Sequence, residues 1–234
     1  MDYFSSALLS ALKLIVNFDA EIWRIVLTSL RISLQACLYA SLFAIPTGVL
    51  LVIVHFPGKQ LLNQVLQTLT AMPTVMVGLI FYGLLSRRGP LGDWGLLYTE
   101  TAVILGQTVL ILPLIINMSS VAVTSADPRL LTTLKILGAN TLQKIITIVA
   151  ECRYALLAAV ITAFGRAIGE VGAAMMLGGN IRGLTRTMTT AIALETSKGN
   201  FELGLALGIV LLAIAFFVTF LLQFITSGSN ISTK

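Results

Sequence analysis

One apolar run near the C-terminus, residues 203–225, most restricts how this chain can fold. It contains no Asp, Glu, Lys or Arg, and its length matches the roughly 20 residues that a helix needs to cross a bilayer. The chain of 234 residues is 57% hydrophobic and 11% charged, whereas soluble domains carry about 25% charged residues. The sequence therefore predicts an integral membrane protein with several spans and little soluble mass.

Four further segments have the length and composition of membrane spans. They are residues 32–54, 61–85, 101–123 and 145–176. Pro46, Pro73 and Pro113 interrupt the first three, and an interrupted backbone at membrane depth must face protein or a cavity. No segment alternates as the strands of a membrane β-barrel do. We therefore expect an all-α polytopic protein with about five transmembrane helices, organised as one transmembrane domain over residues 1–234.

The N-terminal segment, residues 3–16, is apolar but too short to span a bilayer, and it contains Lys13. Such a run is typical of a helix that lies in the membrane interface. Asp19 follows and is placed to cap the next helix, because its side chain can accept hydrogen bonds from the first free N–H groups. The chain is therefore expected to carry a short interfacial helix ahead of its first span.

Residues that could bind a metal are few. His55 is the only histidine, and Cys37 and Cys152 stand singly in apolar surroundings. A His/Cys zinc site needs several such side chains together, so no metal site is expected within one chain.

The segment F-G-R-A-I-G-E-V-G-A-A-M-M-L-G-G-N at residues 164–180 places two charges in an apolar run. Charges at membrane depth cost roughly 2.5–3.5 kcal/mol each. Arg166 and Glu170 are one helical turn apart, so they are expected to pair on one helix face. Three glycines in the same segment leave room for another backbone; they are Gly165, Gly169 and Gly172. The segment predicts a transport pathway or a subunit seam, or else an ion pair that serves packing alone.

The loop at residues 124–144 carries signals for two short helices. Asp127 is a good N-cap, and Gly138 is placed to end the helix that follows. Leucines recur between them at helical spacing, at positions 130, 131, 134 and 137. Asn140 and Gln143 can then form a capping box for the next helix. We expect a helical hairpin whose leucines dock into a groove on a soluble partner, or which simply joins two spans.

This hairpin resembles the cytoplasmic loop of bacterial ABC importer permeases, which carries E-A-A-x3-G-x9-I-x-L-P and docks onto the ATPase. Gly138 matches the glycine of that pattern and Ile148 its isoleucine. Thr132-Thr133-Leu134 stands where E-A-A is expected, and Ala150-Glu151 where L-P is expected. The resemblance implies that residues 124–144 form a cytoplasmic coupling loop. It assigns ATPase contacts to Arg129, Leu131, Thr132, Thr133, Leu134, Lys135, Gly138 and Ala139.

A second resemblance concerns the substrate. R-A-I-G-E-V-G-A at residues 166–173 is similar to the R-A-x-G-E-F-G-A signature of permeases for molybdate, tungstate and sulfate. The stretch T-R-T-M-T-T-A-I at residues 185–192 resembles the tungstate-type branch most. The resemblance covers nearly the whole chain. It implies an ABC importer type I transmembrane domain that moves an oxyanion inward at the expense of ATP, with tungstate as the expected substrate.

The family resemblance also implies partners. Such importers contain two permease copies, two cytoplasmic ABC ATPase subunits and one extracytoplasmic oxyanion-binding protein. The chain lacks the ATP-binding pattern G-x-x-x-x-G-K-[ST]. ATP and Mg²⁺ are therefore expected on the ATPases, and this chain is expected to have no cofactor, no catalytic residue and no ATPase activity of its own. Its basic residues form no run, so nucleic-acid binding is not expected.

A cytoplasmic coupling loop sets the topology in a bacterial inner membrane, with the N-terminus outside and the C-terminus inside. Four arginines then lie outside, namely Arg87, Arg88, Arg182 and Arg186. They are expected to attract an oxyanion, to contact an acidic face of the binding protein, or to meet lipid headgroups. Four polar residues are predicted on the translocation path or gate, because hydroxyls and amides can bind a passing dianion without trapping it. They are Asn180, Thr185, Thr187 and Thr189, for which ordinary turn and capping chemistry is the alternative.

Three other functions stay open at this point. An ABC permease for molybdate, sulfate or another solute would have the same architecture. A proton-coupled secondary transporter would use Glu170 as its proton carrier and would need no ATPase. A membrane-embedded enzyme would need a convergent set of nucleophile, base or metal ligands, which one histidine and scattered carboxylates do not supply. Tungstate and molybdate have nearly the same size and charge, so their discrimination is expected to lie in another polypeptide.

Overall fold

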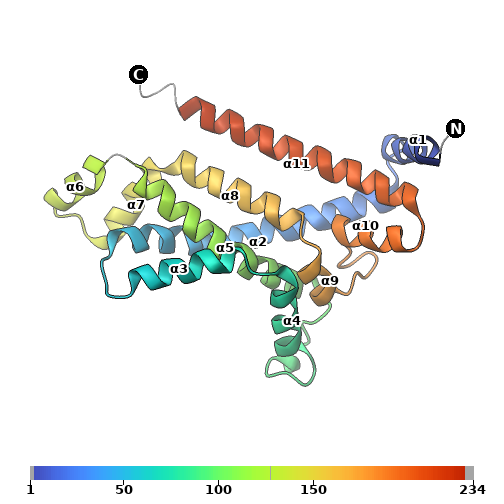
Figure 1. Cartoon of the computed structure of the whole chain (residues 1–234), viewed down its shortest axis with the longest axis horizontal. Helices are drawn as coiled ribbons and strands as arrows, with labels where there is room; N and C mark the ends of the chain where they lie inside the picture. Colours follow the sequence, from blue (N-terminus) through green and yellow to red (C-terminus); the bar gives the residue numbers. More distant parts are fainter. Residues whose placement is uncertain (1–2, 127, 230–234) are drawn as a thin grey trace. The chain divides into compact units, whose positions relative to one another are not determined.

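The computed structural model describes residues 3–126 and 128–229, and every regular element within them is a helix. Figure 1 shows these elements in chain order. The first are α1 (Tyr3–Val16), α2 (Ala20–Ile53), α3 (Lys59–Thr70), α4 (Thr74–Leu85) and the short 3₁₀ helix η1 (Gly92–Trp94). The others are α5 (Glu100–Thr124), α6 (Pro128–Ile136), α7 (Thr141–Glu151), α8 (Arg153–Ile168), α9 (Gly172–Gly178), α10 (Met188–Ser197) and α11 (Phe201–Ser229). The all-α prediction is confirmed.

Among the described residues, three helical segments are long and apolar enough to cross a membrane, namely Ala20–Ile53, Glu100–Thr124 and Phe201–Leu221. Two interrupted helix pairs raise the number to as many as five, if each pair counts as one span. Pro46 and Pro113 lie inside α2 and α5, which continue past them as single helices. The described residues therefore have the helices of the multi-pass membrane protein that the sequence predicts.

Asp19 caps α2 as predicted. Its Oδ1 accepts hydrogen bonds from the N–H groups of Glu21, at 2.9 Å, and of Ile22, at 3.2 Å. These N–H groups lie in the first turn and have no partner inside the helix. The cap therefore fixes the residue at which this long helix begins.

The span predicted over residues 61–85 is interrupted at Pro73, as expected, and its two helices are bent by 96°. α3 ends at Thr70, and α4 begins only at Thr74. Pro73 lies in the break with an extended ψ of 125°, because proline has no N–H to continue a helix and disfavours helical backbone in the residue before it. Its carbonyl accepts a hydrogen bond from the N–H of Met76 at 3.0 Å. The proline thus ends one helix and starts the next.

The span expected at residues 145–176 is also divided. α7 and α8 meet at Cys152 with a bend of 77°, although neither proline nor glycine lies there. Hydrogen bonds continue across the bend, from Cys152 N to Ile148 O at 2.8 Å and from Leu156 N to Cys152 O at 2.9 Å. All three side chains belong to one buried cluster. We therefore attribute the bend to packing rather than to a helix-breaking residue.

Two compact units make up the chain. The first contains the chain up to Ala36 together with Pro73–Gln107 and Gly165–Val218. The second contains Cys37–Met72, Thr108–Phe164 and the described residues from Thr219 onward. Each unit is assembled from three separate stretches, so its packing depends on contacts between residues far apart in sequence.

In the first unit α4 packs against α9, as Figure 1 shows. A Cβ on Gly172 would lie only 2.9 Å from Cγ2 of Val75 and 3.4 Å from its backbone N, so another segment of this chain approaches closely at this glycine. Within this chain Gly165 makes no such approach, because a Cβ there would meet no atom within 4 Å. A Cβ on Gly169 would meet only backbone oxygens of the preceding turn. Within this chain the close approach is found at Gly172, and packing at Gly165 and Gly169 stays a prediction.

In the second unit, buried side chains from five helices form one apolar cluster. They are Val49, Val123, Leu134, Ile148, Cys152 and Leu156. Burial of a side chain of this size stabilises a fold by about 1.5–3 kcal/mol. The cluster therefore holds the short helices α6 and α7 against the longer helices α2, α5 and α8.

Candidate functional site

The predicted coupling hairpin consists of α6 and α7 and turns at Gly138. Gly138 has a φ of 69°, in the left-handed region that glycine adopts without steric cost. Its N–H donates to the carbonyl of Lys135, and the N–H of Ala139 donates to the carbonyl of Leu134, both at 3.1 Å. These two bonds form a Schellman motif, which satisfies the last carbonyls of a helix. The predicted end of the first hairpin helix is confirmed.

The second hairpin helix begins with the predicted capping box. The N–H of Gln143 donates to Asn140 Oδ1 at 2.8 Å, and the N–H of Asn140 donates to Gln143 Oε1 at 2.9 Å. This reciprocal pair satisfies two N–H groups that lack helical partners. Asp127, the predicted N-cap of the first hairpin helix, lies outside the described residues.

The outward face of the hairpin differs from the one expected. Leu131 and Leu134 were predicted to contact the ATPase, but they pack into or against the buried cluster of the second unit. Ile136 and Leu137 are instead 80% and 74% exposed. Leucine spacing alone does not show which side of a short helix meets the core, so Ile136 was not identified from the sequence as an exposed residue that could contact a partner. The exposed apolar residues of the hairpin are Ile136, Leu137, Leu142 and Ile146.

The polar members of the predicted contact set remain at the surface. They are Arg129, Thr132, Thr133 and Lys135, with Gly138 at the turn and Ala139 half-buried beside it. Their predicted contacts with an ATPase stay a prediction.

Arg166 and Glu170 do not share a helix face. α8 ends at Ile168, and residues 169–171 break the chain before α9 begins. Arg166 is exposed whereas Glu170 is buried, and none of the ion pairs found in the described residues joins them. The predicted ion pair is therefore wrong, because an i,i+4 spacing brings two side chains together only within a continuous helix.

Glu170 instead supports the break between α8 and α9. Its Oε1 accepts a hydrogen bond from the N–H of Ala173 at 2.9 Å, in the first turn of α9. Its carbonyl accepts a hydrogen bond from Thr189 Oγ1 at 2.6 Å. On the other side of the break, Gln107 Nε2 donates to the carbonyl of Ala167 at 3.2 Å. The side chain of Glu170 itself and side chains from two other parts of the first unit, Thr189 and Gln107, thus hold this irregular segment.

Three of the four predicted path residues lie in one hydrogen-bond network with Thr190. Thr187 caps α10, since its Oγ1 accepts from Thr190 N at 3.4 Å while its N–H donates to Thr190 Oγ1 at 3.0 Å. Asn180 Nδ2 donates to the carbonyl of Thr190 at 3.2 Å, and the Thr187 and Thr189 hydroxyls are 3.1 Å apart. These contacts are the capping and turn chemistry that the sequence offered as the alternative.

The fourth residue, Thr185, closes the loop that follows α9. Its buried hydroxyl donates to the carbonyl of Gly178 and accepts from the N–H of Ile181 at 3.0 Å. All four predicted residues therefore hold the segment between α9 and α10 in place. Their predicted role on the translocation path stays a prediction.

The helix α10 was not expected, because the sequence predicted no helix between the spans expected at residues 145–176 and 203–225. Four consecutive residues at its start, from Met188 to Ala191, are all buried. A helix buried on several sides has no single apolar face, so it shows no helical period in its sequence. The only sequence signal was the threonine pair of its capping box, which is weaker than the usual Ser/Thr–Glu/Gln form.

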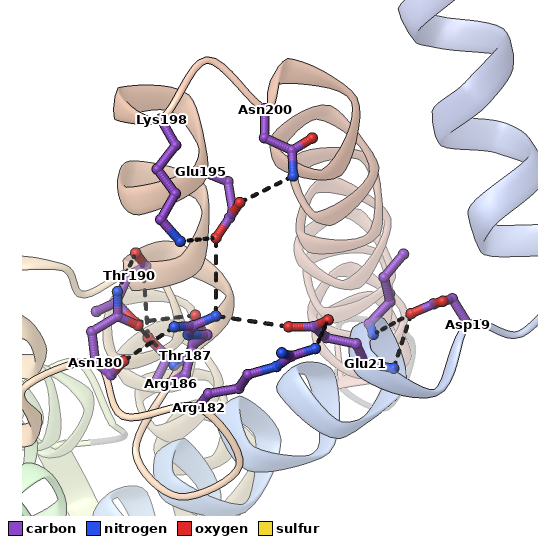
Figure 2. A network of polar contacts seen from close by, with 11 residues as sticks. Asp19, Glu21, Asn180, Arg182, Arg186, Thr187, Thr190, Glu195, Lys198 and Asn200 are labelled. Atoms are coloured by element: carbon purple, nitrogen blue, oxygen red, sulfur yellow. Dashed lines mark hydrogen bonds and ion pairs between the residues drawn. The ribbon is translucent and has the colours of Figure 1, made fainter.

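A network of charges joins α10 to the start of α2, as Figure 2 shows. Glu21 binds Arg182 through a hydrogen-bonded ion pair, and its Oε1 lies 3.7 Å from Arg186 Nη1. Arg186 Nη1 also lies 3.9 Å from Glu195 Oε1. Glu21 is 161 residues from Arg182 in sequence, so no local pattern could have predicted this contact.

Glu195 is the buried end of this network. Lys198 Nζ donates to its Oε1 at 3.0 Å, and Asn200 Nδ2 donates to its Oε2 at 3.1 Å. Burial alone would raise the pKa of the Glu195 carboxyl. The hydrogen bonds from Lys198 and Asn200, with the charges of Lys198 and Arg186, outweigh burial and hold this pKa below its ordinary value. Glu195 is therefore ionised at neutral pH.

A hollow of about 540 Å³ opens beside Glu21 and the arginines. Its lining residues come from the start of α2 and from the loop before α10; they are Asp19, Ala20, Glu21, Arg24, Ile25, Thr28, Arg182, Gly183 and Arg186. The hollow offers three guanidinium groups, two carboxylates and one hydroxyl. Among the described residues, no group of three or more His, Cys, Asp or Glu side chains could hold a metal ion. The chemistry of this site is thus binding by ion pairs and hydrogen bonds.

Several curated proteins are similar to this chain along most of its length, although no protein-family profile matches it. The tungstate uptake system permease protein TupB of Peptoclostridium acidaminophilum is 41% identical over 216 residues, which cover 92% of this chain and 95% of that protein. TupB of Campylobacter jejuni is 40% identical, with 94% of this chain and 92% of that protein covered. The molybdenum transport system permease protein ModB of Escherichia coli is 32% identical, with 82% and 88% covered.

These similarities agree with the helical membrane spans and with the hairpin between α5 and α8. Relatives at 32–41% identity cover more than four fifths of the chain. The chain therefore belongs to the oxyanion permease family of ABC importers, which contains tungstate and molybdate permeases.

Proposed function

We propose that this chain is the membrane subunit through which an ATP-driven importer carries tungstate into the cell. The assignment of tungstate as the substrate rests on the difference in sequence identity. Two tungstate permeases are 40–41% identical to this chain, whereas a molybdenum permease is 32% identical. Molybdate, sulfate or another oxyanion is the alternative within the same architecture.

The importer would divide its work among several subunits. Two copies of this chain would form the path, two cytoplasmic ATPases would bind ATP and Mg²⁺, and an extracytoplasmic protein would capture the oxyanion. Closure of the ATPases on ATP would move the permeases between inward-open and outward-open states, as expected for a bistable assembly biased by its ligands. Since the chain lacks an ATP-binding pattern, we expect the purified permease to hydrolyse no ATP by itself.

The α6–α7 hairpin is the proposed contact with the ATPase. Ile136, Leu137, Leu142 and Ile146 present an exposed apolar surface, and such side chains suit a helix that lies in a hydrophobic groove of a partner. The hairpin would lie in the cytoplasm, which places the N-terminus outside and the C-terminus inside.

Substitution of the exposed hairpin residues tests this contact. The double variant Ile136→Ser, Leu137→Ser should co-purify with much less ATPase, while the unfolding temperature of the isolated permease stays nearly unchanged. Leu134→Ser is the matched contrast, because Leu134 is buried and its loss should lower the unfolding temperature by removing a core side chain. Normal ATPase recovery with the double variant would show that the complex forms elsewhere.

The substrate is tested by the tungsten, molybdenum and sulfur contents of cells with and without this chain, grown at trace oxyanion supply. Selective loss of tungsten in the deletion strain, restored by the cloned chain, supports the proposal. Loss of molybdenum or sulfur instead would move the substrate within the family. No change in any element, in a strain with no redundant importer, would contradict an oxyanion function.

A further inference from the structure

The hollow in the first unit gathers three arginines around a small space. Arg24, Arg182 and Arg186 line it together with Thr28 and Gly183. Guanidinium groups present N–H donors in a planar fork that suits carboxylates and tetrahedral oxyanions. The threonine hydroxyl and a glycine backbone add further groups that can approach a bound anion. The side chains of this hollow therefore have the composition of an anion site.

Arg186 is the most buried of these three cations. Its side chain is only 11% exposed, yet both of its ion-pair distances, 3.7 Å to Glu21 and 3.9 Å to Glu195, are too long for hydrogen bonds. Its Nη2 donates to the carbonyl of Asn180 at 3.5 Å, and its Nε has no partner among the described residues. A guanidinium has five N–H donors, so most of the donor capacity of Arg186 is left for another acceptor.

Glu21 already places one carboxylate between two of the arginines. One of its oxygens binds Arg182 and the other faces Arg186. Its side chain is 29% exposed and that of Arg182 is 70% exposed. Ion pairs with this much exposure contribute little free energy, because water solvates both partners well when they separate. An anion of similar charge can therefore exchange with the Glu21 carboxylate at little cost.

The neighbouring charges favour weak rather than tight binding. The lining holds three arginines against the carboxylates of Asp19 and Glu21, a difference of one positive charge. Asp19 already accepts hydrogen bonds from the start of α2, and Glu195, behind Arg186, is paired with Lys198. A near balance of charge permits an anion to enter and to leave, which a transport path requires.

We propose that this hollow is a transit site for a small tetrahedral oxyanion, and that the Glu21 carboxylate occupies the anion position when the site is empty. The proposal rests on the proposed function for its choice of oxyanion. It assigns Arg182 and Arg186 to anion binding and Glu21 to competition with the anion. The exchange involves ion pairs and hydrogen bonds alone, with no covalent step.

Arginine-selective labelling tests this site. The full-length permease in neutral-lipid nanodiscs is treated with phenylglyoxal, and the labelling of Arg182 is followed by peptide mass spectrometry at increasing concentrations of tungstate or sulfate. Both anions should protect Arg182. The exposed residues Arg87 and Arg88 belong to another loop and should label at unchanged rates, which provides an internal control.

The Glu21→Gln variant separates competition from simple attraction. Loss of the competing carboxylate should lower the half-protecting tungstate concentration about two- to fivefold, as expected for an exposed ion pair. Glu21→Asp, which keeps the charge on a shorter side chain, should give a smaller change in the same direction and replaces Glu21→Gln if that variant does not fold. Arg186→Lys should raise the half-protecting concentration, because lysine keeps the charge but lacks the planar fork.

Three results would overturn the proposal: no protection of Arg182 by either anion, equal protection of Arg87 and Arg88, or an unchanged or raised half-protecting concentration in Glu21→Gln. The assay is repeated with the soluble binding protein added. If Arg182 is protected only in its presence, the arginines contact that protein instead of the free anion. The assay needs neither ATPase nor transport. If cells accumulate tungsten only when they contain this chain, but Arg182 is not protected, this site alone is contradicted. If Arg182 is protected, but the loss of the chain changes the content of no oxyanion element, the proposed function is contradicted.

Discussion

Helices α7 and α10 both begin with a capping box, and they differ in the surroundings of that box. At α7 the box consists of Asn140 and Gln143 at an exposed turn of the second unit. At α10 it consists of Thr187 and Thr190, which are 3% and 0% exposed in the first unit. The same local hydrogen-bond pattern therefore occurs once in contact with solvent and once inside a polar network.

The difference shows how each region is stabilised. An exposed polar group that loses its partner can bind water, whereas a buried one keeps the full cost of desolvation. The hairpin of α6 and α7 is thus held by local bonds and by the apolar cluster beneath it, which leaves its outer surface free for a partner. The segment from α9 to α10 is held by polar contacts among its own residues, many of them buried, and by contacts with Glu170 and with the start of α2. We expect changes in that segment to cost more stability than equivalent changes in the hairpin.

The largest effect is expected for Thr187→Ala. This change removes the cap of α10 and takes away the acceptor of the Thr190 N–H. The hydroxyl of Thr189 loses its contact with Thr187 but keeps its hydrogen bond to the Glu170 carbonyl. We expect a loss of about 1–3 kcal/mol in the free energy of unfolding, measured by denaturant unfolding of the solubilised permease. Thr187→Ser keeps the hydroxyl and is the matched control. A loss as small as that at the hairpin cap would contradict the difference between the two regions.

The second effect concerns the charge of Glu195. Because its pKa is held below the ordinary value, ionised Glu195 stabilises the fold above about pH 4.3, and this contribution is lost as the pH falls through the lowered pKa. Glu195→Gln should reduce stability by about 1–2 kcal/mol at neutral pH, since it weakens hydrogen bonds to a charged acceptor.

Thermal unfolding at several pH values checks this prediction. The difference in unfolding temperature between wild type and Glu195→Gln should be largest near pH 7 and should shrink below about pH 4. A difference that stays constant with pH would show that Glu195 acts through shape rather than charge.

A third and smaller effect is expected at the hairpin turn. Gly138 has a positive φ, and a Cβ there would meet no atom within 4 Å. Gly138→Ala should therefore cost about 1 kcal/mol through backbone strain alone, without a steric clash. Gly138→Asn should cost less, because asparagine tolerates the left-handed region. Equal losses for both variants, measured by denaturant unfolding, would argue against strain as the cause.

The smallest effect is expected for Asn140→Ala. The exposed capping box should lose about 0.5–1 kcal/mol, at the low end for an N-cap, because water can replace the lost acceptor. Asn140→Asp keeps an acceptor and should be nearly neutral. A loss in Asn140→Ala as large as that in Thr187→Ala would show that exposure does not decide the cost of a cap.

Local signals in the sequence were reliable where a short stretch of backbone decides the structure. Asp19, Gly138 and Asn140 form the predicted caps and turn, because every hydrogen bond involved joins residues at most five positions apart. Long apolar runs likewise predicted α5 and α11, since a span needs only length and hydrophobicity.

Local sequence patterns gave wrong predictions where their outcome depended on the length of a helix or on its packing. The Arg166–Glu170 pair required a continuous helix, but α8 ends at Ile168. The leucines of α6 were identified by spacing, but the buried cluster decided that Leu134 faces inward and Leu137 outward. In both cases the residue types were identified correctly. The directions of their side chains were set by the end of α8 in the first case and by the buried cluster in the second.

The sequence by itself therefore determined the membrane class, the principal spans, the hairpin turn and the family, because hydrophobic length, capping and matched motifs are properties of consecutive residues. Only the tertiary structure decided the bend at Cys152, the helix α10 and the meeting of Glu21 with Arg182 and Arg186. These features depend on contacts between distant segments, whose free energy no local pattern in the chain contains.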